Sequence, residues 1–101
     1  MTRLMHAVAT RDEWHATLAE LPAADLLQSW DWGEFKSRHG WTPQRWVWWH
    51  EGRPLAAAQL LRRSEKRFGL RATIAYVPRG PLLDWADADL RRRVLRDLRS
   101  L

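Results

Sequence analysis

The chain has 101 residues, 46% of them hydrophobic and 29% charged, which is typical of one small globular domain, or part of a larger one, and not of a disordered segment. The absence of cysteine excludes disulfide frameworks and thiolate metal sites, and no apolar run approaches the ~18–20 residues of a membrane span. The N-terminus lacks the long apolar core of a signal peptide, so we expect a cytoplasmic protein.

The positive charge comes almost entirely from arginine. The formal net charge is +5, and Lys36 and Lys66 are the only lysines among the 17 basic side chains. A basic balance suits nucleic acid, anionic lipid headgroups or phosphorylated small substrates. The arginines are spread along the chain instead of forming one block, so an arginine-rich composition without a binding role is an equal alternative.

The first elements are predicted to be a short strand, over residues 3–8, and a helix. Thr10 begins a capping-box pattern, in which its hydroxyl and the Glu13 carboxylate satisfy the first free amides of the helix. Pro22 is expected to end this helix. Its apolar stripe, at spacings i, i+4 and i+7, is formed by Trp14, Leu18 and Leu21.

A second helix is predicted over residues 29–38, with Ser29 as its N-cap. Helical spacing places four side chains of this helix on neighbouring positions: Trp32, Phe35, Lys36 and His39. Lys36 therefore shares a face with aromatic side chains and does not belong to a purely polar face. We expect Trp32 or Phe35 to pack inward, and Lys36 to reach outward at a cleft.

The apolar period changes to two after Trp41, which we expect to anchor the following strand. Two strands are predicted over residues 44–49 and 55–61, joined by a tight turn at residues 50–53. Both faces of the first strand carry apolar side chains, which predicts a strand covered on both sides. One face has Trp46 and Trp48, and the other has Val47 and Trp49.

The last third of the chain is predicted to be a basic connection, a strand and a helix. The connection is "RRSEKRFGLR", residues 62–71, and the strand covers residues 72–77. The helix, at about residues 86–101, has acidic residues at its start, arginines later, and an apolar stripe formed by Leu90, Val94, Leu98 and Leu101. Because the sequence stops within this stripe, we expect a chain truncated after this helix. These elements predict an α+β domain with a mostly antiparallel sheet and flanking helices.

Few motifs of known chemistry occur. The four histidines lack metal-ligand spacing, so no metal site is expected, and the isolated glycines form no phosphate-binding loop. No nucleophile–base motif is visible, so the catalytic residues stay unassigned. In "YVPRGPLLD" two prolines bracket Arg79 and Gly80 at the end of a strand, a place where ligands are often bound. The alternative is an ordinary rigid turn whose arginine pairs with a neighbouring acid.

The order of several motifs resembles the N-terminal part of the FemABX family, the peptidoglycan-bridge aminoacyltransferases. The similar stretches are "LLQSWDWGEFKSRHGW", "GRPLAAAQLL" and "IAYVPRGPLLD", followed by a basic helix, and together they span about residues 8–101. Each feature alone is weakly specific, whereas their combination is fairly specific. The combination consists of Gln28–Ser29, Trp32, Lys36, Gly40–Trp41 and the "PRGP" turn.

The resemblance implies that residues 1–101 are the N-terminal part of a GNAT-like domain, in an enzyme built from two such domains. Enzymes of this family transfer an amino acid from aminoacyl-tRNA, their co-substrate, to the peptide stem of a nucleotide-linked or lipid-linked peptidoglycan precursor. No further cofactor and no metal are implied. A lipid-linked acceptor is compatible with a peripheral position at the membrane.

The resemblance also assigns roles to residues. The acceptor carries a diphosphate, and Lys36 matches a family lysine that contacts the phosphates of the precursor. Further candidate substrate-binding residues are Arg79, Trp32 and Tyr76. A partner arginine, most acceptor-binding tyrosines and the residues that assist proton transfer belong to parts of the family that this chain lacks. We therefore expect the 101-residue chain to be inactive by itself.

Two other functions stay open on the sequence. One is a small basic module that binds RNA or another polyanion through arginines interleaved with tryptophans. The other is a GNAT-type N-acyltransferase that acts on a different amine. The pyrophosphate-loop pattern of coenzyme A enzymes, Q/R-x-x-G-x-G/A, does not occur, so we expect no appreciable binding of acetyl-coenzyme A.

Overall fold

The computed structural model describes residues 4–21, 28–67, 69–78 and 80–101. The first four strands of its sheet form a meander, in which the first pairs antiparallel with the second, the second with the third and the third with the fourth. A fifth, short strand pairs antiparallel with the third. The strands are β1 (Leu4–Ala7), β2 (Thr42–His50), β3 (Arg53–Arg67), β4 (Leu70–Tyr76) and β5 (Leu82–Leu83).

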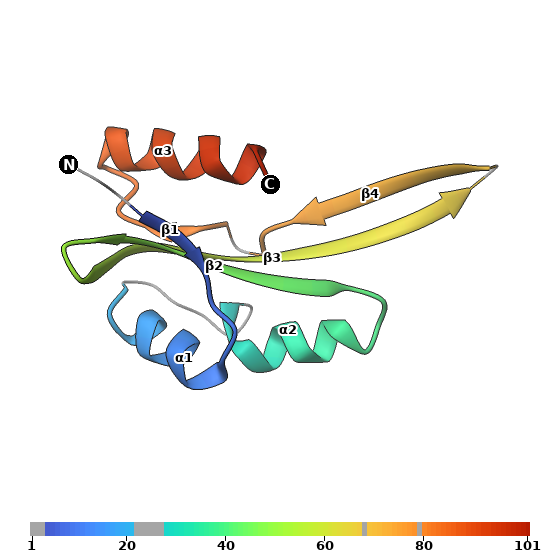
Figure 1. Cartoon of the computed structure of the whole chain (residues 1–101), viewed down its shortest axis with the longest axis horizontal. Coiled ribbons are helices and arrows are strands. Elements are labelled where there is room, and N and C mark those ends of the chain that lie inside the picture. Colours follow the sequence, from blue (N-terminus) through green and yellow to red (C-terminus); the bar gives the residue numbers. More distant parts are fainter. Residues whose placement is uncertain (1–3, 22–27, 68, 79) are drawn as a thin grey trace.

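Helices lie on both faces of this sheet. Figure 1 shows two of them on one face, α1 (Arg11–Ala19) and α2 (Trp30–Ser37), whereas α3 (Ala88–Arg99) covers the other face. This arrangement confirms the predicted α+β fold with a mostly antiparallel sheet and flanking helices. The assignment to the GNAT-like type of fold stays a prediction.

Each helix begins at a side-chain cap. The hydroxyl of Thr10 accepts a hydrogen bond from the Glu13 amide at 3.3 Å, and the hydroxyl of Ser29 accepts one from the Trp32 amide at 3.1 Å. Both N-caps were predicted, because a short polar side chain satisfies amides that have no partner inside the helix. Asp87 caps α3 in the same way. The first helix ends at Ala19, before Pro22, which lies outside the described residues.

The predicted tight turn between β2 and β3 is confirmed. His50 pairs with Arg53, and the two residues between them have φ angles of +51° at Glu51 and +76° at Gly52. Two consecutive positive φ angles follow the right-handed twist of the strands, and glycine adopts such an angle without steric cost.

The prediction that residues 62–71 form a connection is wrong. The third strand continues to Arg67, and the fourth begins at Leu70, so that the two form one long hairpin. Residues 62–67 show no alternation of apolar and polar side chains, because both sides of a two-stranded hairpin meet solvent and charged side chains can occupy its strand positions. Strand β5, which pairs with the start of β3, was also not predicted.

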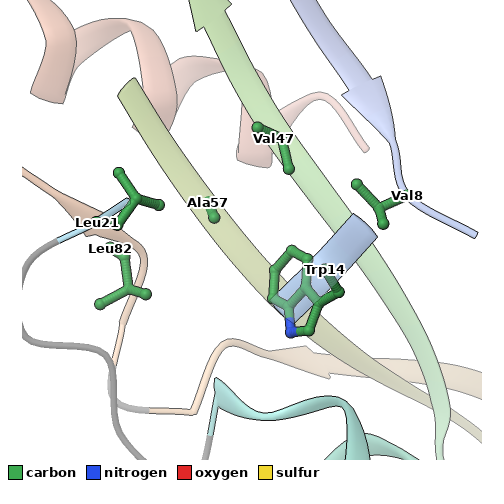
Figure 2. Packing of buried hydrophobic residues seen from close by; sticks show 6 residues of the cluster. All are labelled: Val8, Trp14, Leu21, Val47, Ala57 and Leu82. Carbon is green, nitrogen blue, oxygen red and sulfur yellow. The ribbon is translucent and has the colours of Figure 1, made fainter. Parts of the chain in front are cut away.

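The hydrophobic core has two halves, one on each face of the sheet. Figure 2 shows the half under α1, formed by Val8, Trp14, Leu21, Val47, Ala57 and Leu82. The half under α3 is formed by Trp48, Ala56, Ala58, Leu83, Leu90 and Val94. Val47 and Trp48 are both fully buried, which confirms that β2 is covered on both faces. In the predicted stripe of α3, Leu90 and Val94 are buried, but Leu101 is exposed.

Two buried indoles connect the helices to the rest of the fold. The indole N–H of Trp14 donates to the Gln28 carbonyl at 2.8 Å, which joins α1 to the segment before α2. The indole N–H of Trp48 donates to the Asp97 carboxylate, also at 2.8 Å, which joins β2 to α3. A buried N–H group without an acceptor would be costly, because it would lose its hydrogen bonds to water without replacement. These two hydrogen bonds therefore favour the positions in which α1 and α3 are observed.

Candidate functional site

The second helix is held on the sheet by a buried arginine of β2. The Arg45 guanidinium donates to the Gln59 side chain at 2.8 Å and to the Trp30 carbonyl at 3.0 Å. It also lies 3.5 Å from the centroid of the Trp30 ring and 3.4 Å from the Glu34 carboxylate. Because a buried guanidinium is stable only with partners, this set of contacts fixes the position of α2.

Burial and charge act on Arg45 in opposite directions. Desolvation lowers the pKa of Arg45, and the Glu34 carboxylate raises it in partial compensation. The Gln59 amide, itself buried, donates to the Ser29 carbonyl at 3.0 Å. The start of α2 is thus joined to β3 as well as to β2.

Gly33 allows α2 to lie this close to the sheet. A Cβ atom at this position would overlap Arg45 Nη2 and would lie 2.5 Å from Gln59 Oε1. Only glycine leaves room for the guanidinium and the amide directly under the helix. The position of the whole helix, including its exposed face, therefore depends on this residue.

The exposed face of α2 carries Lys36 between two indoles. Lys36 Nζ lies 5.8 Å from the centroid of the Trp32 ring and 5.6 Å from that of the Trp41 ring. Gly40, with a φ angle of +90°, turns the chain after the helix, and the Trp41 amide donates back to the Lys36 carbonyl at 3.2 Å. Local chain reversal therefore brings Trp41 beside the lysine.

Trp41 also contacts the β3–β4 hairpin. The Arg63 guanidinium lies 5.7 Å from the centroid of its ring, and the Tyr76 ring meets it edge-on at 5.0 Å. Arg63 is paired with Glu65 at 3.1 Å. We call this group of five residues the Trp41 cluster: Trp32, Lys36, Trp41, Arg63 and Tyr76.

The structure brings three of the four predicted substrate-binding residues together. Lys36 lies beside the Trp32 and Trp41 rings, and Trp41 in turn contacts Tyr76, whereas Arg79 lies outside the described residues. Of the two rings, one of which was expected to pack inward, Trp32 is half-buried, whereas Phe35 is 47% exposed.

Sequence reasoning missed Arg63 as a member of the cluster. Residues 62–71 were predicted to be a connection, and only the pairing of Leu61 with Tyr76 and of Arg63 with Ile74 places the guanidinium near Trp41. The alternating positions in "LRRSEK" could have indicated it, because residues 61, 63 and 65 lie on one side if this stretch is a strand, which places Arg63 on the same side as Leu61.

The cluster can bind an anion. Two cations lie within 6 Å of the centroid of one ring, and half-buried surroundings weaken the screening of their charge by water. In the described part of the chain, no group of three or more His, Cys, Asp or Glu side chains could hold a metal ion. None of the helices described is long and apolar enough to cross a membrane.

The geometry of the Trp41 cluster does not identify the protein family, which follows from comparison with known families. The sequence profile of the FemAB family matches residues 9–101. The chain belongs to the FemAB family. Comparisons with curated proteins and with solved structures found no match.

Family membership confirms the resemblance seen in the sequence motifs. It gives the protein a transferase role of the general kind found in peptidoglycan-bridge aminoacyltransferases. Neither alternative, a polyanion-binding module or an N-acyltransferase for another amine, gains support from this match.

Proposed function

We propose that the protein takes part in transferring an amino acid from aminoacyl-tRNA to the peptide stem of a peptidoglycan precursor, on the cytoplasmic side of the membrane. The part described here binds the diphosphate of the acceptor through Lys36. The observation that carries this proposal is the position of Lys36 between the Trp32 and Trp41 rings, in a chain of the FemAB family.

The surroundings of Lys36 suit a phosphate ligand. Lys36 is half-buried, and its ammonium group lies within 6 Å of the centroids of two aromatic rings. In such surroundings a long cationic side chain can bury its stem while its charge stays available to a ligand. An ammonium ion binds phosphate oxygens as a compact point charge with three donors. The two indoles limit the positions that the ammonium group can take, which lowers the entropy cost of binding.

Arg63 and Tyr76 extend the same site toward the hairpin. The Arg63 guanidinium adds a second positive charge beside Trp41, although Glu65 partly neutralises it. Tyr76 is 37% exposed and offers a phenol at the edge of the cluster. A diphosphate carries negative charge on the oxygens of two phosphate groups and can therefore contact both Lys36 and Arg63.

Binding of a nucleotide-linked muropeptide, measured by calorimetry, tests this proposal. A charge-assisted contact of an ammonium group with phosphate contributes about 1.5–3 kcal/mol, so Lys36→Ala should weaken binding about ten- to a hundredfold. Lys36→Arg should recover part of the affinity, because the charge is kept while the donor geometry changes.

Lys66→Ala is the matched control, because Lys66 is the other lysine of the chain and is exposed on β3. It removes the same charge and should leave binding within about twofold of the wild type, as expected for a surface substitution. Equal affinities of the Lys36→Ala and Lys66→Ala variants would contradict the proposal.

A further inference from the structure

The β3–β4 hairpin projects beyond the rest of the molecule. The ladder between β2 and β3 reaches only as far as Arg62, which pairs with Thr42. From there β3 and β4 continue as a two-stranded ribbon that extends away from the helices (Figure 1). A two-stranded ribbon has no hydrophobic core of its own, so the side chains on both of its sides are exposed unless another part of the molecule or a partner covers them.

One side of this ribbon exposes large apolar residues. Residues directly opposite in an antiparallel ladder point to the same side, so the pairs Leu61–Tyr76 and Arg63–Ile74 share a side. Alternation along β4 adds Leu70 to that side. The three large apolar residues of β4 on this side, Tyr76, Ile74 and Leu70, are 37%, 48% and 75% exposed.

The opposite side of the ribbon differs in character. Its described side chains are small or polar, and they belong to Arg62, Ser64, Lys66, Thr73 and Ala75. The ribbon is therefore amphipathic, and its apolar side faces solvent. Alternating large apolar residues on an exposed strand are a feature that soluble monomers avoid unless the surface has a partner.

This apolar side continues into the exposed face of α2. Tyr76 contacts Trp41, which lies beside Lys36, and Phe35 contacts the His39 ring at 4.7 Å and is 47% exposed. We call the combined surface the ribbon face. Its apolar members are Phe35, Leu70, Ile74 and Tyr76, its cations are Lys36 and Arg63, and its one described anion on the ribbon is Glu65, which pairs with Arg63 at 3.1 Å.

We propose that the ribbon face docks on the surface of an anionic lipid bilayer. Aromatic rings prefer the level of the headgroups, aliphatic side chains enter the acyl boundary, and lysine and arginine attract anionic lipids. The ribbon face presents all three kinds of side chain together, and the chain carries a net charge of +5. Each lysine or arginine near an anionic surface strengthens such docking.

Charge and side-chain type favour a bilayer over other partners. A second copy that docked through the same face would add its own Lys36 and Arg63 to the interface, and like charges at an interface oppose association. A nucleic acid would use the cations and the rings, but its bases stack on aromatic side chains and gain little from Leu70 and Ile74. Acyl chains accept these two aliphatic side chains.

Flotation of the full chain with lipid vesicles tests this inference. One set of vesicles contains phosphatidylcholine alone, and the other contains phosphatidylcholine with phosphatidylglycerol. The wild type should bind the anionic vesicles and bind them less as salt increases. The Leu70→Ser/Ile74→Ser variant buries two fewer aliphatic side chains in the bilayer. Its partition coefficient between anionic vesicles and water should therefore be at least about tenfold lower than that of the wild type.

Two controls separate docking from other effects. Trp85 is 46% exposed but lies between β5 and α3, so Trp85→Ser should leave vesicle binding within about twofold of the wild type. Leu70→Ser alone changes a residue that is 75% exposed, so it should fold like the wild type and still bind vesicles less. Circular dichroism melts check the folding of each variant.

Failure of this inference is distinct from failure of the proposed function. The Leu70→Ser/Ile74→Ser variant should keep its affinity for the water-soluble nucleotide-linked muropeptide, whereas Lys36→Ala should lose it. Equal flotation with neutral and anionic vesicles would overturn the inference. It would also be overturned if the Leu70→Ser and Leu70→Ser/Ile74→Ser variants floated with anionic vesicles like the wild type. The same holds if these substitutions reduced self-association or RNA binding and left vesicle binding unchanged.

Discussion

Replacing Gly33 with alanine should destabilise the protein, although alanine is the better residue for a helix. Helix propensity alone would make the alanine variant more stable by about 1 kcal/mol. At this position, however, the added methyl group would overlap Arg45 Nη2 and lie 2.5 Å from Gln59 Oε1. Contacts of that length force either the two side chains or the helix to move.

The cost of that movement follows from the hydrogen bonds involved. Displacing the guanidinium and the amide weakens the 2.8 Å bond of Arg45 to Gln59 and the 3.0 Å bond of Arg45 to the Trp30 carbonyl. A buried donor left without its partner costs about 1–3 kcal/mol, and more if it is charged. Two bonds weakened at this cost, less the gain in propensity of about 1 kcal/mol, give an expected net loss of about 1–5 kcal/mol and a Tm lower by at least about 5 °C.

Urea denaturation of the wild type and the variant measures this loss. Ser37→Ala is the control, because Ser37 is exposed on the same helix, and it should change the free energy of unfolding by less than about 0.5 kcal/mol. In a Gln59→Ala background the cost of Gly33→Ala should shrink, since one of the two clashing groups is gone. A Gly33→Ala variant as stable as the wild type, or more stable, would refute the view that α2 is seated through Gly33.

Three further predictions concern caps, turns and helix packing. Asp97→Ala should cost about 1–3 kcal/mol in urea denaturation, because it leaves the buried Trp48 indole N–H without its acceptor, whereas Asp89→Ala at an exposed ion pair should cost less than about 0.5 kcal/mol. Equal costs for these two variants would contradict the role of Asp97. Thr10→Ala should lower stability by about 1 kcal/mol in thermal melts, and Thr10→Ser by only a few tenths, since serine keeps the cap; the reverse order would exclude capping by the hydroxyl. Gly52→Ala should cost about 1 kcal/mol despite open space around it, because its φ angle of +76° is unfavourable for alanine, and an unchanged melt would show that the turn adapts.

Features that depend on a few neighbouring residues could be predicted from the sequence. Thr10 and Ser29 mark helix starts because their hydroxyls accept hydrogen bonds from amides three residues further on, and "HEGR" marks a turn because Gly52 accepts a positive φ angle. Covering of β2 on both faces followed from its run of apolar residues. In each case the deciding interaction lies within a short stretch of chain.

Features that depend on distant pairing could not be predicted in this way. The ribbon was missed because charged residues occupy its strand positions, and the pairing of Arg63 with Ile74 becomes visible only in the folded hairpin. The seat of α2 was missed for the same reason, since Gly33, Arg45 and Gln59 lie on three separate elements. Helical spacing did identify Lys36 beside Trp32, but it did not show that Trp41 connects Lys36 to Arg63 and Tyr76.

The most direct test of diphosphate binding by Lys36 compares two acceptors on three proteins. The acceptors are the nucleotide-linked muropeptide and the same muropeptide without its phosphates, and the proteins are the wild type, Lys36→Ala and Lys66→Ala. The quantity compared is the dissociation constant of the phosphate-free muropeptide divided by that of the nucleotide-linked one. If Lys36 binds the diphosphate, this ratio should be large for the wild type and for Lys66→Ala, and about ten- to a hundredfold smaller for Lys36→Ala. The same ratio in all three proteins would show that Lys36 does not bind the phosphates.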